Sequence, residues 1–139
     1  MIAIALPMTP PSPYDGDTSP RRAQGGGDFM AKPAILVRDW RTTEAALRVA
    51  RADGTSPVMI TPENAAATYG AGYLAALQAR AETEFPDVAF TLIVDCGKAP
   101  GYALACLRAG VRTISMAEPN EKIADIARKM GAELVRRPT

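Results

Sequence analysis

Short apolar runs alternate with longer helical patterns from Pro33 onward, and this alternation constrains the fold more than any other feature of the chain. The runs are rich in β-branched residues and recur about every 20–30 residues, the spacing of strand–helix–strand units. They cover residues 34–37, 57–60, 90–95, 111–116 and, more briefly, 133–135. Continuous apolar strands are typical of a parallel sheet covered on both faces. The sequence therefore predicts an α/β fold with a four- to five-stranded parallel sheet, arranged as a half-barrel or as a flavodoxin-like open sheet.

Helix start and stop signals stand between these runs. Thr42 or Thr43 can cap a helix after the first strand, and Gly54 closes it. Gly70 and Gly72 interrupt a long alanine-rich helical pattern, which predicts a kink or two short helices. The clearest helical pattern has one apolar face, made of Ile123, Ile126, Ala127 and Met130.

Residues 1–32 differ in composition from the rest of the chain and are rich in Pro and Gly. Such a segment cannot bury enough apolar surface to offset chain entropy, so we expect a disordered extension, with a single α/β domain at 33–139. Met30 is a candidate for the true start. The codons of Gly25-Gly26-Gly27 are purine-rich, as a bacterial ribosome-binding site would be, and the ordered pattern begins directly after Met30.

Composition removes several classes of function. The net charge of +1 and the aromatic content of 6% argue against nucleic-acid binding, and no apolar run approaches the roughly 20 residues of a membrane span. The chain has no histidine, so neither a Ser-His-Asp nor a Cys-His mechanism can operate within it. We expect no metal site and no cofactor. Cys96 and Cys106 fall in one strand–helix unit, so we expect free thiols and a cytoplasmic location.

The segment 90–110 carries the most chemistry. An apolar strand ends in Asp95-Cys96-Gly97-Lys98, and Pro100 and Gly110 mark the start and end of the helix that follows. Ligands of α/β proteins bind at the carboxyl ends of such strands. Asp95, Cys96 and Lys98 are therefore candidate catalytic residues. In the alternative interpretation, Asp95 caps the next helix and Cys96 is a small buried residue.

Five short motifs occur in an order that resembles the first half of the barrel of the class II fructose-bisphosphate aldolases. They are Ser56-Pro57-Val58-Met59-Ile60, Tyr69-Gly70-Ala71-Gly72, Val94-Asp95-Cys96-Gly97, Arg108-Ala109-Gly110 and Thr113-Ile114-Ser115-Met116. The resemblance extends roughly from Ala34 to Val135. It implies that Asp95 corresponds to the acid that moves a proton on the carbonyl substrate.

The chain departs from this family at the metal. Cys96 occupies the position of a metal-binding histidine of the family, and a zinc site needs about three protein ligands. Barrels of this type have eight strands and around 250 residues, about twice what is present here. The resemblance therefore implies a degenerate half-barrel without aldolase activity.

Polar residues follow the other predicted strands as well. Because the carboxyl ends of parallel strands meet at one edge, beside the N-termini of the following helices, these residues predict a site for a small anion. The candidate ligand-binding residues are Arg38, Asp39, Thr61, Glu63, Asn64, Glu118 and Asn120. Caps of ordinary strand–helix loops would give much the same set.

Three functions remain open. The first is binding of a phosphorylated or carboxylated metabolite at this edge, without aldol chemistry. The second is a homo-oligomeric structural or interaction protein, with the sheet edge and the alanine-rich helix in the interface. The third is a small carbonyl-processing enzyme that uses Asp95 with Cys96 or Lys98.

Overall fold

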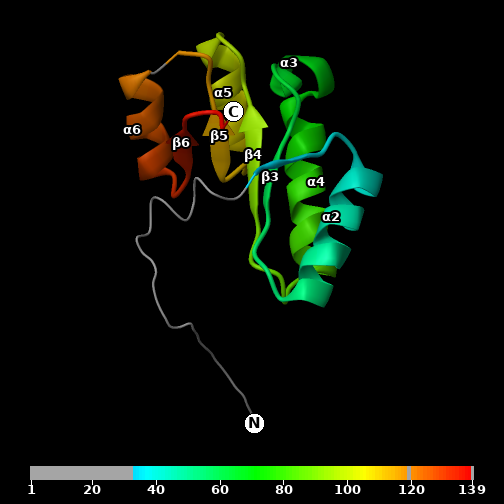
Figure 1. The fold of residues 1–139 in the computed structure, drawn as a ribbon. Coiled ribbons are helices and arrows are strands. Elements are labelled where there is room, and N and C mark those ends of the chain that lie inside the picture. Colours follow the sequence, from blue (N-terminus) through cyan, green and yellow to red (C-terminus); the bar gives the residue numbers. More distant parts are fainter. Residues whose placement is uncertain (1–32, 119, 139) are drawn as a thin grey trace. The chain divides into compact units, whose positions relative to one another are not determined.

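The computed structural model describes residues 33–118 and 120–138 (Figure 1). Residues 34–139 form one compact unit. The expected disordered extension and the start at Met30 lie outside the described residues. In the ranges that the structure describes, no helix combines the length and the apolar character needed to cross a membrane.

Strands and helices alternate along the described chain. The elements are β2 (Ile35–Leu36), α2 (Trp40–Asp53), β3 (Val58–Ile60), α3 (Ala65–Tyr69), α4 (Ala71–Glu84), β4 (Thr91–Asp95), α5 (Pro100–Ala109), β5 (Thr113–Ser115), α6 (Glu121–Lys129) and β6 (Glu133–Val135). The predicted α/β fold with a parallel sheet is confirmed.

The five strands lie in the sheet in the order in which they occur in the chain, β2-β3-β4-β5-β6, and every pair is parallel. A flavodoxin-like sheet reverses direction at a switch point, and the order of the five described strands contains no such reversal. Winding in one direction is the order of strands in (β/α) barrels, and it agrees with the half-barrel alternative.

Helices cover one face of this sheet. Crossovers between parallel strands are right-handed, so a sheet wound in one direction carries all its crossover helices on the same side. Val94 and Ile114 point to that side and belong to the main core cluster with the helices, whereas Ile60 and Ile93 are buried on the opposite face. No described helix covers that second face. The central strands are buried on both faces, as expected, but the described residues form no second layer of helices.

Local capping explains the helix boundaries. Asp39, rather than Thr42 or Thr43, is the N-cap of α2, and its side chain accepts a hydrogen bond from Thr42 N at 2.9 Å. The hydroxyl oxygen of Thr42 accepts from Asp39 N at 3.2 Å, which completes a capping box. Gly70, at φ 90°, separates α3 from α4, so the prediction of two helices is confirmed over that of a kink.

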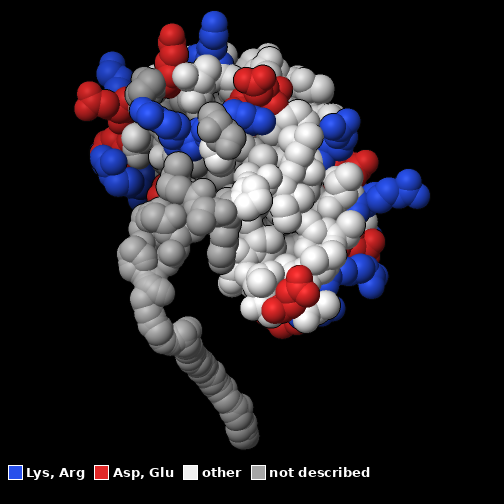
Figure 2. Space-filling model, in the orientation of Figure 1, with Lys and Arg blue, Asp and Glu red and all other residues white. Residues whose placement is uncertain are grey.

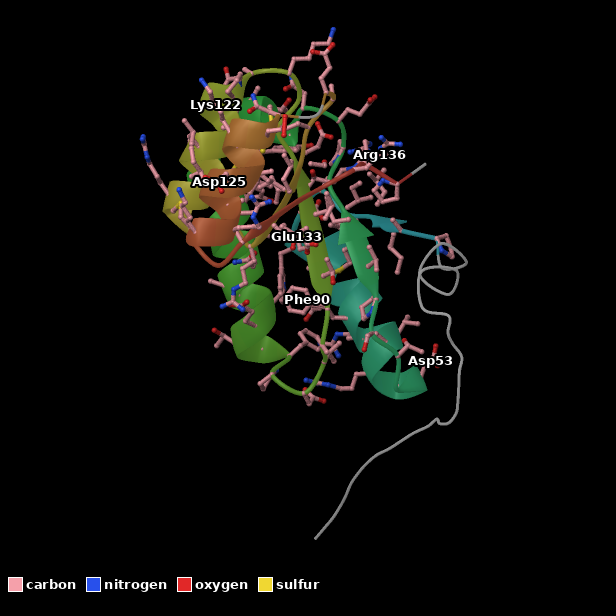
Figure 3. The ribbon with its side chains drawn as sticks, turned by 90° about the vertical axis from the view of Figure 1, so that its left-hand side faces the viewer. Asp53, Phe90, Lys122, Asp125, Glu133 and Arg136 are labelled. Atoms are coloured by element: carbon pink, nitrogen blue, oxygen red, sulfur yellow. The ribbon has the colours of Figure 1, made fainter. Side chains whose placement is uncertain are left out.

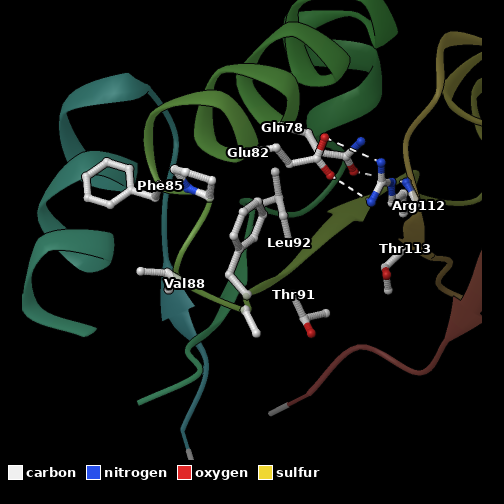
Figure 4. A pocket seen from close by; sticks show the side chains of 11 residues that line it. Gln78, Glu82, Phe85, Val88, Thr91, Leu92, Arg112 and Thr113 are labelled. Carbon is white, nitrogen blue, oxygen red and sulfur yellow. Dashed lines mark hydrogen bonds and ion pairs between the residues drawn. The ribbon is translucent and has the colours of Figure 1, made fainter. Parts of the chain in front are cut away.

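Gln78 fastens α4 to the turn between α5 and β5, at the amino end of the sheet (Figure 4). Its side chain donates to Gly110 O at 2.8 Å and accepts from Arg112 N at 3.0 Å. Arg112 also forms an ion pair with Glu82 at 2.9 Å. A hollow of about 300 Å³ lies beside these residues. Because backbone groups satisfy the side-chain amide of Gln78, we assign this residue a structural role: it holds α4 to the amino end of the sheet.

Candidate functional site

A cleft of about 1130 Å³ opens at the carboxyl ends of β4, β5 and β6. Its walls are largely apolar and include Tyr102, Met116, Ala124 and Leu134. It also reaches the first residues of α5 and α6 and the chain that follows β6. The cleft therefore lies at the sheet edge where ligand sites of parallel α/β proteins occur.

Asp95, the last residue of β4, is the polar centre of this edge. Its carboxylate is buried and accepts four hydrogen bonds. One oxygen accepts from the backbone N–H groups of Asn64 and Gly97, at 2.7 and 2.9 Å. The other accepts from Ser115 Oγ at 3.0 Å and from Arg137 Nη1 at 3.3 Å. Asp95 thus links the loops after β3 and β4 to β5 and to the C-terminal segment.

Two backbone conformations allow this arrangement. Asn64 has φ 60° and Gly97 has φ 67°, both in the left-handed region, and these turns aim both N–H groups at one carboxylate oxygen. A Cβ atom at position 97 would collide with Oδ1 of Asn64. Glycine is therefore required at position 97 both for its backbone conformation and for the close approach of the two loops.

Thr61 supports Asp95 from the side. It is buried, and its hydroxyl oxygen accepts a hydrogen bond from Asp95 N at 2.9 Å. Its own N–H donates to Ile93 O at 3.0 Å, so it ties the end of β3 to β4. Thr61 does not line the cleft, and its contacts hold the backbone of Asp95 and the guanidinium of Arg137 in place.

Arg137 was not among the residues that the sequence predicted for the site. Nη1 of its guanidinium donates to Thr61 O at 3.0 Å and to Asp95 Oδ2 at 3.3 Å. In Figure 1 the chain leaves β6 and crosses toward β4, and Figure 3 labels Arg136 on this segment. The side chain of Arg137 is 26% exposed and that of Asp95 is 5% exposed, so this is a largely buried ion pair.

Some of the predicted site residues line the cleft and others lie outside it. Those that line the cleft are Glu63, Asn64, Asp95, Lys98, Glu118 and Asn120. Asn120 also caps α6 by accepting from Ile123 N at 3.1 Å. Arg38 and Asp39 lie outside the cleft, at the start of α2.

Cys96 is fully buried and does not line the cleft. A hydrogen bond with the thiol of Cys106, together with burial, raises the pKa of Cys96 above its ordinary value. Nucleophilic catalysis needs an accessible thiolate, and both effects disfavour that form. The alternative interpretation of Cys96, as a small buried residue, agrees better with these observations.

Among the described residues, no three His, Cys, Asp or Glu side chains gather in a group that could hold a metal ion. Comparison of the chain with protein-family models gave no match, and comparison with curated proteins gave none either. The candidate function therefore has to be argued from the cleft itself.

Proposed function

We propose that this cleft binds a small organic molecule that carries one anionic group, a carboxylate or a phosphate, on an apolar body. The observation that carries the proposal is the combination of largely apolar walls with Lys98, Arg136 and Arg137 around one opening. Binding sites for small molecules have this composition, with a few polar groups that orient the ligand. We also propose a cytoplasmic location, from the two free cysteines.

The start of α5 favours an anion in the same place. Ala99 occupies the N-cap position and provides no side-chain hydrogen bond, and Pro100 is the first helical residue. The positive end of the helix dipole therefore meets the cleft without a capping carboxylate. Lys98 precedes this helix end directly and forms no ion pair with another described residue.

Acidic residues limit the charge that the ligand can carry. Glu63, Glu118 and Glu121 also line the cleft. A polyphosphate would place several negative charges near these carboxylates, at a cost in Coulomb energy. A carboxylic acid or a phosphate monoester of small size is therefore the proposed ligand class, and an aldol reaction is not part of the proposal.

A catalytic role for Asp95 is less favoured. Both of its oxygens are engaged by donors, and general-base chemistry would require Ser115 or Arg137 to release one of them. The proposal therefore treats Asp95 as an organiser of the cleft, within a degenerate, aldolase-like half-barrel.

A thermal-shift panel of phosphorylated sugars, 2-oxo acids and nucleotides tests the proposal. A ligand at about 100 times its Kd adds roughly 2.7 kcal/mol, which raises the Tm of a domain of this size by on the order of 10 °C. We expect a shift with a sugar monophosphate or with a 2-oxo acid, and a smaller shift in Lys98→Ala. Arg108→Ala is the matched control, because Arg108 is an exposed cation in the last turn of α5, away from the cleft. A flat panel, or an equal loss in both variants, would contradict the proposal.

A homo-oligomer is the second candidate, and one observation favours it. Ile35 and Leu36 of β2, the edge strand of the described sheet, are 43% and 47% exposed, and an apolar strand edge of this kind can pair with another chain. Figure 2 shows a broad uncharged surface over the part of the domain that contains β2, β3 and β4, with charged side chains at its margins. Mass measurement by light scattering on the native chain and on Leu36→Lys tests this; a native chain that is strictly monomeric would contradict it.

A further inference from the structure

Arg137 is fixed in the cleft through only one of its three nitrogens. Nη1 donates both of its described hydrogen bonds, to Thr61 O and to Asp95 Oδ2. Neither Nε nor Nη2 has an acceptor among the described residues. We infer that Arg137 receives the anionic group of the ligand side-on, through Nε–H and Nη2–H, while Nη1 stays on Thr61 and Asp95. This inference rests on the proposed function and names the residue that recognises the anion.

The geometry of guanidinium supports this assignment. Nε–H and one N–H of Nη2 are parallel and match two oxygens of a carboxylate or a phosphate, the arrangement of the strongest arginine–oxyanion pairs. The two contacts of Nη1 hold the plane of the group before any ligand arrives. Less side-chain entropy is then lost on binding than for a free arginine.

The other two cations of the cleft are not held in this way. Lys98 and Arg136 are exposed, and neither forms a hydrogen bond or an ion pair with another described side chain. The side chain of Arg137 is 26% exposed, so its interactions are screened less by water than theirs. Arg137 is therefore expected to contribute more to anion affinity than either of them.

The ion pair with Asp95 does not cancel this capacity. Asp95 is already stabilised by the N–H groups of Asn64 and Gly97 and by the hydroxyl of Ser115, so Arg137 is one donor among four. Asp95 approaches Nη1, at the end of the guanidinium. The carboxylate thus orients the guanidinium of Arg137 and leaves its Nε–H and Nη2–H groups to bind a second anion.

The side-chain Nε–H resonance of Arg137 reports this contact directly in ¹H–¹⁵N NMR spectra. We would titrate the full chain with inorganic phosphate and, separately, with pyruvate, and assign the signal by through-bond correlation to the backbone of Arg137. The inference expects a saturable shift of this signal with at least one probe. The two probes distinguish a phosphate from a carboxylate as the preferred group.

Affinity measurements on two conservative variants complete the test. Arg137→Lys keeps the positive charge and loses the two parallel N–H donors. We therefore expect the Kd for the probe that shifts the signal to rise roughly ten- to a hundredfold. Arg108→Lys is the matched control, because Arg108 is an exposed arginine of α5 away from the cleft, and it should change the Kd less than about threefold. Melting curves without ligand show whether each variant is folded. If Arg137→Lys does not fold, the Nε–H titration of the native chain alone tests the inference.

The outcomes separate this inference from the proposed function. Saturable shifts of backbone amides in the cleft, such as those of Lys98 and Ala99, without a shift at Arg137 Nε would overturn the inference and leave the proposed function standing. An unchanged Kd in a folded Arg137→Lys variant would do the same. No saturable shift anywhere in the cleft, together with a flat thermal panel, would overturn both.

Discussion

Replacement of Asp95 by Asn keeps the shape of the side chain and removes the charge at the centre of the strand-end network. The amide oxygen of Asn can still accept from the N–H groups of Asn64 and Gly97. The amide nitrogen would then face Nη1 of Arg137, and two donors would point at each other. Ser115 can turn its hydroxyl to accept, so the loss falls mainly on the contact with Arg137.

The magnitude follows from the burial of the two partners. Removal of one member of a buried ion pair costs about 3–5 kcal/mol when the remaining charge cannot escape. Arg137 keeps its bond to Thr61 O, and its side chain is 26% exposed, so part of that cost is relieved by water. We therefore expect Asp95→Asn to lower the free energy of unfolding by about 2–3 kcal/mol, of the order of one lost hydrogen bond to a charged group.

Urea unfolding followed by circular dichroism measures this change. A loss of this size lowers the Tm of a domain of this length by on the order of 10 °C, with the m value unchanged. Asp53→Asn is the control, because Asp53 is an exposed acid at the end of α2 with no ion pair to another described residue. A loss below about 0.5 kcal/mol, or equal losses in the two variants, would refute the reasoning that Asp95 organises the cleft.

Two further predictions concern the backbone and the start of α2. Gly97→Ala should destabilise the domain by more than Gly54→Ala. The φ angles of Gly54 and Gly97 are 69° and 67°, where alanine costs roughly 1–2 kcal/mol, but only at Gly97 would the new Cβ also collide with Asn64. Equal losses in a urea series would refute the claim of close approach. Hydrogen bonds from the backbone and the hydroxyl of Thr42 hold the pKa of Asp39 below its ordinary value of 3.8. A carboxyl group whose pKa is lower in the folded state stabilises the protein at pH values above its unfolded pKa. This stabilisation is lost as the pH falls through the folded pKa. The native chain should therefore exceed Asp39→Asn in stability at neutral pH and lose this advantage as the pH falls below 3.8 and through the folded pKa. A difference that does not change with pH would contradict this.

The fold could be predicted from the sequence because its signals are local. The last helix has a clear apolar face, and Gly70 separates α3 from α4 where the sequence predicts an interruption. The strand order is harder to predict from the sequence, because a flavodoxin-like sheet and a sheet wound in one direction contain the same strand–helix units. The cap of α2 was assigned to a threonine because Asp39 and Thr42 both suit that position.

The site could be predicted only in part, for a related reason. Residues that follow parallel strands meet at one edge, which is why Asn64, Asp95 and Glu118 could be grouped from spacing alone. Their functional roles stay predictions. Arg137 lies 42 residues from Asp95 in a short basic tail, and no local pattern indicates that its side chain turns back to the sheet. The role of Cys96 depended on its surroundings, because burial beside Cys106 is a tertiary property.

The chain-order winding of the sheet has a consequence for how the protein folds. Each strand pairs with the strands that directly precede and follow it in the chain, and each parallel pairing spans a whole crossover, as between Met59 and Leu92 or between Ile93 and Thr113. Folding can spread from one strand–helix unit to the next, and each step is slow because a crossover loop must close before the new strand pairs. The bond from Arg137 to Thr61 joins residues 76 positions apart and requires β6 to be in place already. We expect this loop, with its large closure entropy, to close after the sheet has formed, and with it the edge of the cleft at which we propose anion binding.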